Sequence, residues 1–211
     1  GFPLALAVSS NTFYYQVGLK VGPDELFKAA RRMGYGQVTG IELVEEETPG
    51  LLGDQAWKQE VLGEGWTPVD TITSAIGQGA LQVTPIQMAR LYAAVANGGW
   101  LVTPHLVERP TERTWIGLKP ATLQVLRDGL RQVVTNGSAT ILNDPSLPPV
   151  AGKTGTSEGG RDLWFIGSIP QLTTGVWLGY DSSRETKNTS VVATYAWRAF
   201  MEPITKTRPV R

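Results

Sequence analysis

The hydrophobic pattern of this 211-residue chain changes at Pro149, and that change most limits the folds it can adopt. Before Pro149, apolar residues recur at helical spacing, as where Leu123, Leu126 and Leu130 fall on one face of a run that ends near residue 137. After it, short β-rich runs alternate with Gly-Gly and Pro-Gln breaks, a pattern typical of an antiparallel meander. We therefore expect a mixed α/β fold.

The predicted order of elements follows from the same pattern. Helices are expected over about 9–145, a strand meander over about 149–180 and a terminal helix over about 189–202. Capping patterns place helix starts at Ser10, Pro23 and Thr84. The stretch between Gly34 and Pro85 is rich in glycine and acidic residues, and it is predicted to be a long, loop-like connection.

Composition removes several classes of function. With no cysteine and one histidine, the chain lacks the residues of a disulfide framework, a thiol nucleophile or most zinc and copper sites. Its 19 basic and 19 acidic residues give zero net charge, so no overall field attracts nucleic acid. We expect neither a metal nor a nucleic-acid partner. The opening GFPLALAV is too short for a signal peptide, and without an initiator Met the chain is expected to be a piece of a longer protein.

The motif with the most specific chemistry is Lys153-Thr154-Gly155-Thr156. The pattern K-T-G-[S/T] would arise by chance in about one in a hundred chains of this length. A strand with an ammonium and hydroxyls beside a glycine lets a second extended chain approach its backbone. The same side chains are suited to bind a terminal carboxylate. Alone, the motif is equally compatible with an ordinary edge strand.

A second short pattern, Ser9-x-Asn11, stands at a predicted helix boundary. Alone it is weak, because it arises by chance about once in every two or three such chains, and helix capping would explain it. Followed far downstream by K-T-G-T, it resembles two of the three motifs of penicillin-recognising serine enzymes.

The surrounding sequence extends that resemblance to residues 4–202. The runs that carry it are ALAVSSNTFYYQVG, LGEGWTPVDTITSAIGQGALQVTPIQMARLYAAVANGG, AGKTGTSEGG and WFIGSIP. They resemble the transpeptidase domain of a penicillin-binding protein, and the first two are most like class B enzymes of the elongation type. The stretch from GGRDLWFIGS through TTGVWLGYD is more similar to class A enzymes.

The resemblance implies the penicillin-binding or serine β-lactamase-like fold, a mainly antiparallel sheet with a helical subdomain, here incomplete. Residues 1–211 would be the C-terminal portion of a single transpeptidase domain. The implied activity is peptidoglycan D,D-transpeptidation: serine acyl transfer on D-Ala-D-Ala stem peptides, which β-lactams mimic, without a cofactor. No serine here has a lysine three residues later, so the S-x-x-K nucleophile is absent. It would lie in an upstream segment, and this chain alone would be inactive.

The family's residue roles carry over onto matching positions. Lys153 would supply positive potential, Thr154 and Thr156 would bind the terminal carboxylate, and Gly155 would stay small so that the peptide packs against it. The Thr156 N–H would be one of two oxyanion-hole donors.

Two roles concern proton transfer. Ser9 would relay a proton between the catalytic lysine and the leaving amine, and Asn11 would hydrogen-bond that lysine and the substrate amide. The resemblance also implies a membrane anchor, a location outside the cytoplasmic membrane and membership of a wall-synthesis complex.

Two other readings of the sequence stay open at this point. One is a pseudoenzyme, or a peptidoglycan- or β-lactam-binding module, that keeps the peptide groove without the serine. The other is a β-lactamase-like hydrolase or sensor. The IGQG and VTP-IQMA runs favour a penicillin-binding protein over the hydrolase or sensor.

Overall fold

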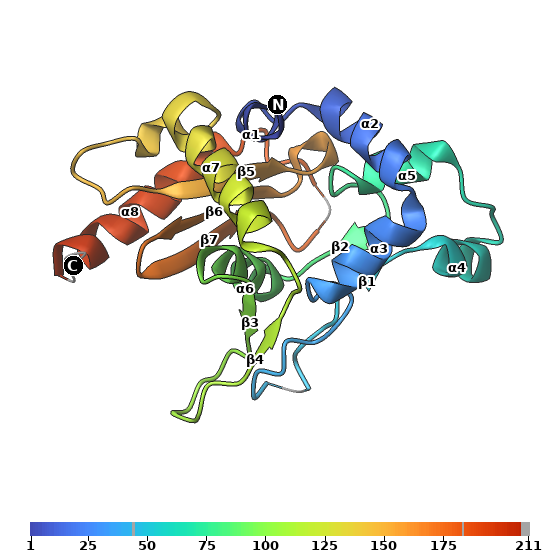
Figure 1. The fold of residues 1–211 in the computed structure, drawn as a ribbon, viewed down its shortest axis with the longest axis horizontal. Coiled ribbons are helices and arrows are strands. Elements are labelled where there is room, and N and C mark those ends of the chain that lie inside the picture. Colours follow the sequence, from blue (N-terminus) through green and yellow to red (C-terminus); the bar gives the residue numbers. More distant parts are fainter. Residues whose placement is uncertain (44, 183, 208–211) are drawn as a thin grey trace. The chain divides into compact units, whose positions relative to one another are not determined.

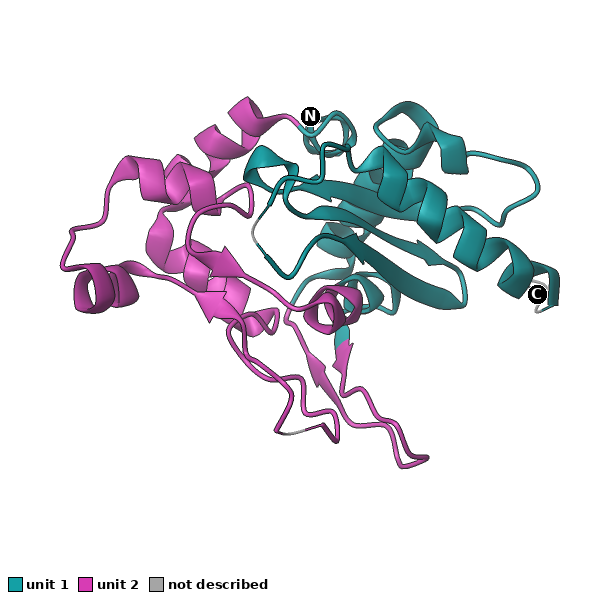
Figure 2. Ribbon diagram, turned by 180° about the vertical axis from the view of Figure 1, so that it is seen from behind, with its two compact units in different colours: residues 1–9, 92–100, 118–211 teal, residues 10–91, 101–117 magenta. Residues whose placement is uncertain are grey.

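The structure is a computed structural model that describes residues 1–43, 45–182 and 184–207 (Figure 1). It divides into two compact units, which are described separately (Figure 2). Unit 1 comprises residues 1–9, 92–100 and 118–211, and unit 2 comprises residues 10–91 and 101–117. Two residues of the motifs found in the sequence, Ser9 and Lys153, both belong to unit 1.

A three-stranded antiparallel sheet forms the centre of unit 1, in the order β5 (Ala151–Thr156), β6 (Leu163–Ile169) and β7 (Leu172–Leu178). In the register, Lys153 lies opposite Ile166, which in turn lies opposite Gly175. Within the described residues β5 pairs on one side only and is therefore an edge strand. The combination of helices with an antiparallel sheet confirms the predicted mixed α/β class.

Helices α7 (Pro120–Asn136) and α8 (Val191–Thr207) pack with this sheet around one core, together with α1 (Phe2–Ala7) and the short 3₁₀ turn η2 (Thr140–Leu142). A second 3₁₀ turn, η3 (Glu158–Gly160), follows β5 and has no buried residue. The core is centred on fully buried Trp197 and Phe165, whose rings meet edge to face with centroids 5.4 Å apart. The Trp197 Nε1 donates to the Thr174 carbonyl on β7 at 3.2 Å, so the indole keeps a polar partner while buried.

The terminal helix is longer than the predicted 189–202, since α8 continues to Thr207 with Pro203 inside it. Proline has no N–H and normally ends or kinks a helix, which is why the sequence pattern placed the end earlier. Ile204, one residue beyond the proline, packs against the core of unit 1, and this packing favours continuation of the helix.

Unit 2 is mostly helical. Its elements are α2 (Asn11–Val21), α3 (Pro23–Arg32), β1 (Leu51–Leu52), α4 (Gln55–Trp57), the π-helical turn η1 (Lys58–Leu62), α5 (Pro68–Ser74), β2 (Leu81–Gln82) and β4 (Arg113–Trp115). Two further elements, α6 (Pro85–Ala96) and β3 (Trp100–Val102), contain residues of both units. Strands β1 and β2 pair antiparallel, and β3 pairs with β4.

The helix starts expected from capping patterns are confirmed. The Ser10 hydroxyl accepts a hydrogen bond from the Phe13 N–H at the start of α2, and Pro23 is the first residue of α3. At α6, Thr84 and Gln87 form a reciprocal capping box at 2.8 and 3.2 Å.

The loop-like connection predicted between Gly34 and Pro85 is wrong in part, because this stretch contains α5 and the β1–β2 pair. A capping box begins α5: the Thr67 hydroxyl accepts from the Asp70 N–H, and the Asp70 carboxylate accepts from the Thr67 N–H at 2.7 Å. Asp stands here where the usual pattern has Glu or Gln, and the helix is rich in β-branched residues of low helix propensity. The local signal for this helix was therefore weak.

No helix within the described residues is both long and apolar enough to cross a membrane.

Candidate functional site

Strand β5 presents the K-T-G-T motif along the open edge of the sheet in unit 1. The Lys153 Nζ donates to the Ser9 Oγ at 2.5 Å and to the Thr154 carbonyl oxygen at 2.9 Å. Ser9 and Lys153 stand 144 positions apart in the sequence. The fold therefore joins the serine of S-x-N to the lysine of K-T-G-T within one unit.

Burial of Lys153 changes how readily its side chain holds a proton. Exclusion of water from around the ammonium lowers the pKa of Lys153 from its ordinary 10.5 to about 8. At neutral pH most molecules still carry the proton and donate it to Ser9, while about a tenth hold a neutral amine. A lysine whose pKa lies near neutrality is suited to exchange a proton in both directions during a reaction.

Ser9 has an unusual backbone conformation, with φ at +53° although it is not glycine. Left-handed conformations of this kind cost energy in non-glycine residues and occur at functional sites where the surrounding structure holds them. Its N–H donates to the Leu6 carbonyl at 3.3 Å, in the short connection between α1 and α2. Ser10, and not Ser9, caps α2. The hydroxyl of exposed Ser9 instead accepts the hydrogen bond from Lys153.

The other three residues of the motif differ in their surroundings. Thr154 is buried, with 8% of its surface exposed, and its Oγ1 lies 2.6 Å from the Ser138 Oγ. Gly155 faces Trp164 on β6 so closely that an added Cβ would lie 3.2 Å from the tryptophan Cβ. Thr156 is exposed at the end of β5. Because side chains alternate along a strand, Thr154 and Thr156 share one face and Lys153 and Gly155 the other.

Asn11, the last predicted site residue, is the exposed first residue of α2 in unit 2. The S-x-N motif thus spans the boundary between the two units, with Ser9 in unit 1. The role expected for Asn11 stays a prediction.

Two features of this region were missed from the sequence. Ser138, in the turn after α7, pairs with Thr154. In the turn after β5, the Asp162 carboxylate accepts from the Ser157 hydroxyl at 2.7 Å and from the Trp177 Nε1 at 2.9 Å. This carboxylate ties the end of the K-T-G-T strand to β7. Both contacts join residues from separate elements, and no short sequence pattern signals them.

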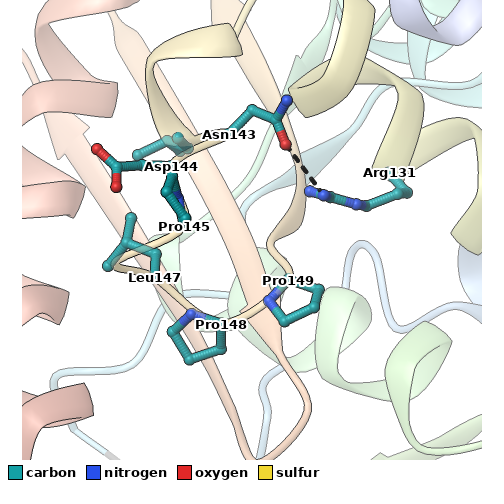
Figure 3. A pocket seen from close by; sticks show the side chains of 8 residues that line it. Arg131, Asn143, Asp144, Pro145, Leu147, Pro148 and Pro149 are labelled. Atoms are coloured by element: carbon teal, nitrogen blue, oxygen red, sulfur yellow. Dashed lines mark hydrogen bonds between the residues drawn. The ribbon is translucent and has the colours of Figure 1, made fainter.

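A hollow of about 340 Å³ elsewhere in unit 1 is lined by the turn after η2 and by α7 (Figure 3). Arg131 on α7 donates to the Asn143 Oδ1 at 3.1 Å and to the Val150 carbonyl at 2.7 Å. The Asp144 carboxylate is paired with Arg198 at 2.7 Å. These charged groups are satisfied within the protein, and the hollow contains neither Ser9 nor Lys153. Its lining comprises Arg131, Leu142, Asn143, Asp144, Pro145, Leu147, Pro148 and Pro149.

Among the described residues, no three histidine or acidic side chains gather in a group that could hold a metal ion.

Residues 2–202 match the family described as penicillin binding protein transpeptidase domain. A curated relative, the peptidoglycan D,D-transpeptidase MrdA of Salmonella typhimurium, is 44% identical over 103 residues, which cover 49% of this chain and 16% of the relative.

Two solved structures from Helicobacter pylori are also similar. The penicillin-binding protein PBP2 superposes with a TM-score of 0.86 at 25% identity, over 99% of this chain and 40% of that one. The same protein in complex with MreC gives a TM-score of 0.78 at 26% identity, over 98% and 40%. The chain therefore spans less than half the length of each of these relatives.

Proposed function

We propose that this chain acts in peptidoglycan D,D-transpeptidation, because it belongs to the penicillin-binding protein transpeptidase domain family. The observation that carries this proposal is the hydrogen bond from the Lys153 ammonium to the Ser9 hydroxyl. Residues 1–211 are then the C-terminal portion of one transpeptidase domain. The acylating serine comes from an S-x-x-K segment outside them.

The hydrogen bond sets the direction of proton transfer. Because the Lys153 ammonium donates to the Ser9 Oγ, the single proton of that hydroxyl is left to point at another acceptor. In the reaction, the S-x-x-K serine gives its proton to the lysine of the same motif as it attacks the carbonyl between the two D-Ala residues, and the C–N bond breaks as the ester forms. The Ser9 proton passes to the leaving amine of D-Ala, and Lys153 replaces it.

The open edge of β5 supports the proposed mode of substrate binding. An extended stem peptide adds to this edge by main-chain hydrogen bonds, as peptides do in β-augmentation. Gly155 leaves room for the approach, and the hydroxyls of Thr154 and Thr156 donate to the terminal carboxylate while Lys153 supplies positive charge. β-Lactams, which mimic the same dipeptide, acylate the same serine.

The wider setting follows from the relatives. We propose the class B elongation type, because the similar proteins are named MrdA and PBP2. The Helicobacter PBP2 solved with MreC supports membership of a wall-synthesis complex. The proposed location is outside the cytoplasmic membrane, on an anchored protein.

Labelling with a fluorescent penicillin tests the proposal. The full gene product should form a covalent band that survives a denaturing gel, because its S-x-x-K serine and β5 then share one site. Residues 1–211 alone should stay unlabelled. An unlabelled full product would instead favour the pseudoenzyme, and a labelled 211-residue chain would show that the nucleophile is one of its own serines.

A further inference from the structure

The hydroxyl of Ser138 is placed against the motif strand by the turn that ends α7. Its Oγ lies 2.6 Å from the Thr154 Oγ1. Ser138 itself is exposed, whereas Thr154 is buried with 8% of its surface exposed. The pair thus joins a solvent-facing hydroxyl to one fixed within the sheet.

Close packing holds this turn in position. A Cβ on Gly137 would lie 2.3 Å from the Ala7 carbonyl oxygen and 2.8 Å from the Val133 Cα, so only glycine fits there. The next residue but one, Ala139, is fully buried and its N–H donates to the Val133 carbonyl at 3.1 Å. Ala7 precedes Ser9 by two positions. The turn therefore contacts both the segment that carries Ser9 and the strand that carries Lys153.

We propose that Ser138 is a positioning residue that orients the Thr154 hydroxyl toward the substrate carboxylate, an inference that rests on the proposed function. A threonine hydroxyl has one proton and accepts two hydrogen bonds. When Ser138 donates to the Thr154 Oγ1, the Thr154 proton is left for a carboxylate. Ser138 thus acts through Thr154 and without touching the ligand. A bond to a charged acceptor is among the stronger ones, so its orientation matters for acylation.

A double-mutant cycle in the full gene product tests this inference, with the second-order rate of acylation by fluorescent penicillin as the readout. Thr154→Ala is expected to lower the rate about tenfold to a hundredfold, the range for a hydrogen bond to a charged group. Ser138→Ala should lower it about fivefold, since an unheld hydroxyl still donates part of the time. The double variant should match Thr154→Ala within about twofold, because the two residues act as one unit.

Two controls separate positioning from general stability. Ser138→Thr keeps the hydroxyl and should restore acylation to within about twofold of the wild type. Ser168 and Thr173 form a similar hydroxyl pair at 2.8 Å between β6 and β7. Ser168→Ala therefore removes a matched bond in the same sheet and should leave acylation unchanged.

The outcomes separate this inference from the proposed function. If the wild type is not acylated, both fail. If the wild type is acylated but Ser138→Ala matches it, only this inference is overturned. Losses that multiply in the double variant would mean that Ser138 acts independently of Thr154, and failure of Ser138→Thr to restore the rate would exclude a role for the hydroxyl. Either result also overturns it.

Discussion

The Lys153 ammonium and the Ser9 hydroxyl lie 2.5 Å apart, so the two residues that open the K-T-G-T and S-x-N motifs form one hydrogen-bonded pair. Lys153 is largely removed from water and Ser9 is held in a left-handed backbone conformation. Each residue bears an energetic cost, from a desolvated charge and from backbone strain. Such costs persist where function requires the geometry.

Removal of the amine should abolish most of the acylation. Lys153→Ala in the full gene product is expected to lower the acylation rate by about a hundredfold or more, the upper part of the range for a positioned acid–base group. Stopped-flow measurement with a fluorescent penicillin gives this rate. Lys28→Ala is the matched control, because Lys28 is exposed and pairs only with its helix neighbour Glu25 in the described contacts. An undiminished rate in Lys153→Ala would remove the proposed role.

The pKa of Lys153 predicts an alkaline limit to activity. Acylation should fall as the pH rises through about 8, because the ammonium that donates to Ser9 then loses its proton. Arginine keeps its charge throughout this range. In Lys153→Arg, whatever activity remains should therefore persist to higher pH. A rate profile recorded from pH 6 to 10 provides the measurement, and the same alkaline limb in both proteins would assign it to another group.

The same pKa predicts how stability changes with pH. The folded-state pKa of about 8 lies below the ordinary 10.5, so between these values the unfolded chain binds more protons than the folded one. Stability of the wild type should therefore rise as the pH increases through this window, and the penalty of the buried charge is fully present below it.

Lys153→Met removes that penalty and keeps the aliphatic stem. The variant should be more stable by about 1–2 kcal/mol at pH 7, after allowance for the lost hydrogen bonds. The difference should shrink toward pH 10.5. Urea unfolding at several pH values would measure it, and a constant difference would argue against a depressed lysine pKa.

Adjacent serines should separate stability from activity. Ser10→Ala removes the N-cap of α2 and should cost about 1 kcal/mol of stability, with acylation maintained. Ser9→Ala should slow acylation about tenfold to a hundredfold with little change in melting temperature, because Ser9 caps no helix. The reverse pattern, with Ser9→Ala unstable and Ser10→Ala slow, would exchange the two roles.

Two glycines of β5 should respond differently to alanine. At Gly152 a Cβ would lie 2.5 Å from the Ile166 carbonyl oxygen and 2.7 Å from the Phe165 ring, so Gly152→Ala should cost about 3 kcal/mol. At Gly155 the nearest atom is 3.2 Å away, and the cost should be about 1 kcal/mol.

Acylation distinguishes the two variants further. Gly155→Ala should lower the acylation rate about tenfold, because its methyl group projects where the peptide approaches β5. Measured below its melting temperature, Gly152→Ala should keep the wild-type rate. Thermal unfolding and acylation assays on both proteins test this, and equal rates for Gly155→Ala and wild type would place the peptide elsewhere.

Local features of the fold were predictable from the sequence. The caps at Ser10, Pro23 and Thr84 operate within three or four residues, so their pattern is visible in the chain itself. The strand meander was predictable from the change in hydrophobic period along the chain. The family was predictable from the S-x-N and K-T-G-T motifs and the runs around them. Where the local signal was weak, at the Asp-based capping box of α5, the prediction failed.

The sequence by itself thus determined the order and type of most elements and the motifs whose residues are proposed to carry the chemistry. Only the tertiary structure decided that Lys153 meets Ser9, that this lysine is desolvated, and that the Ser138 and Thr154 hydroxyls form a hydrogen bond. The physical reason is that these contacts join segments far apart in the chain. Their geometry depends on how α1, α7 and β5 pack together, which no short-range pattern specifies.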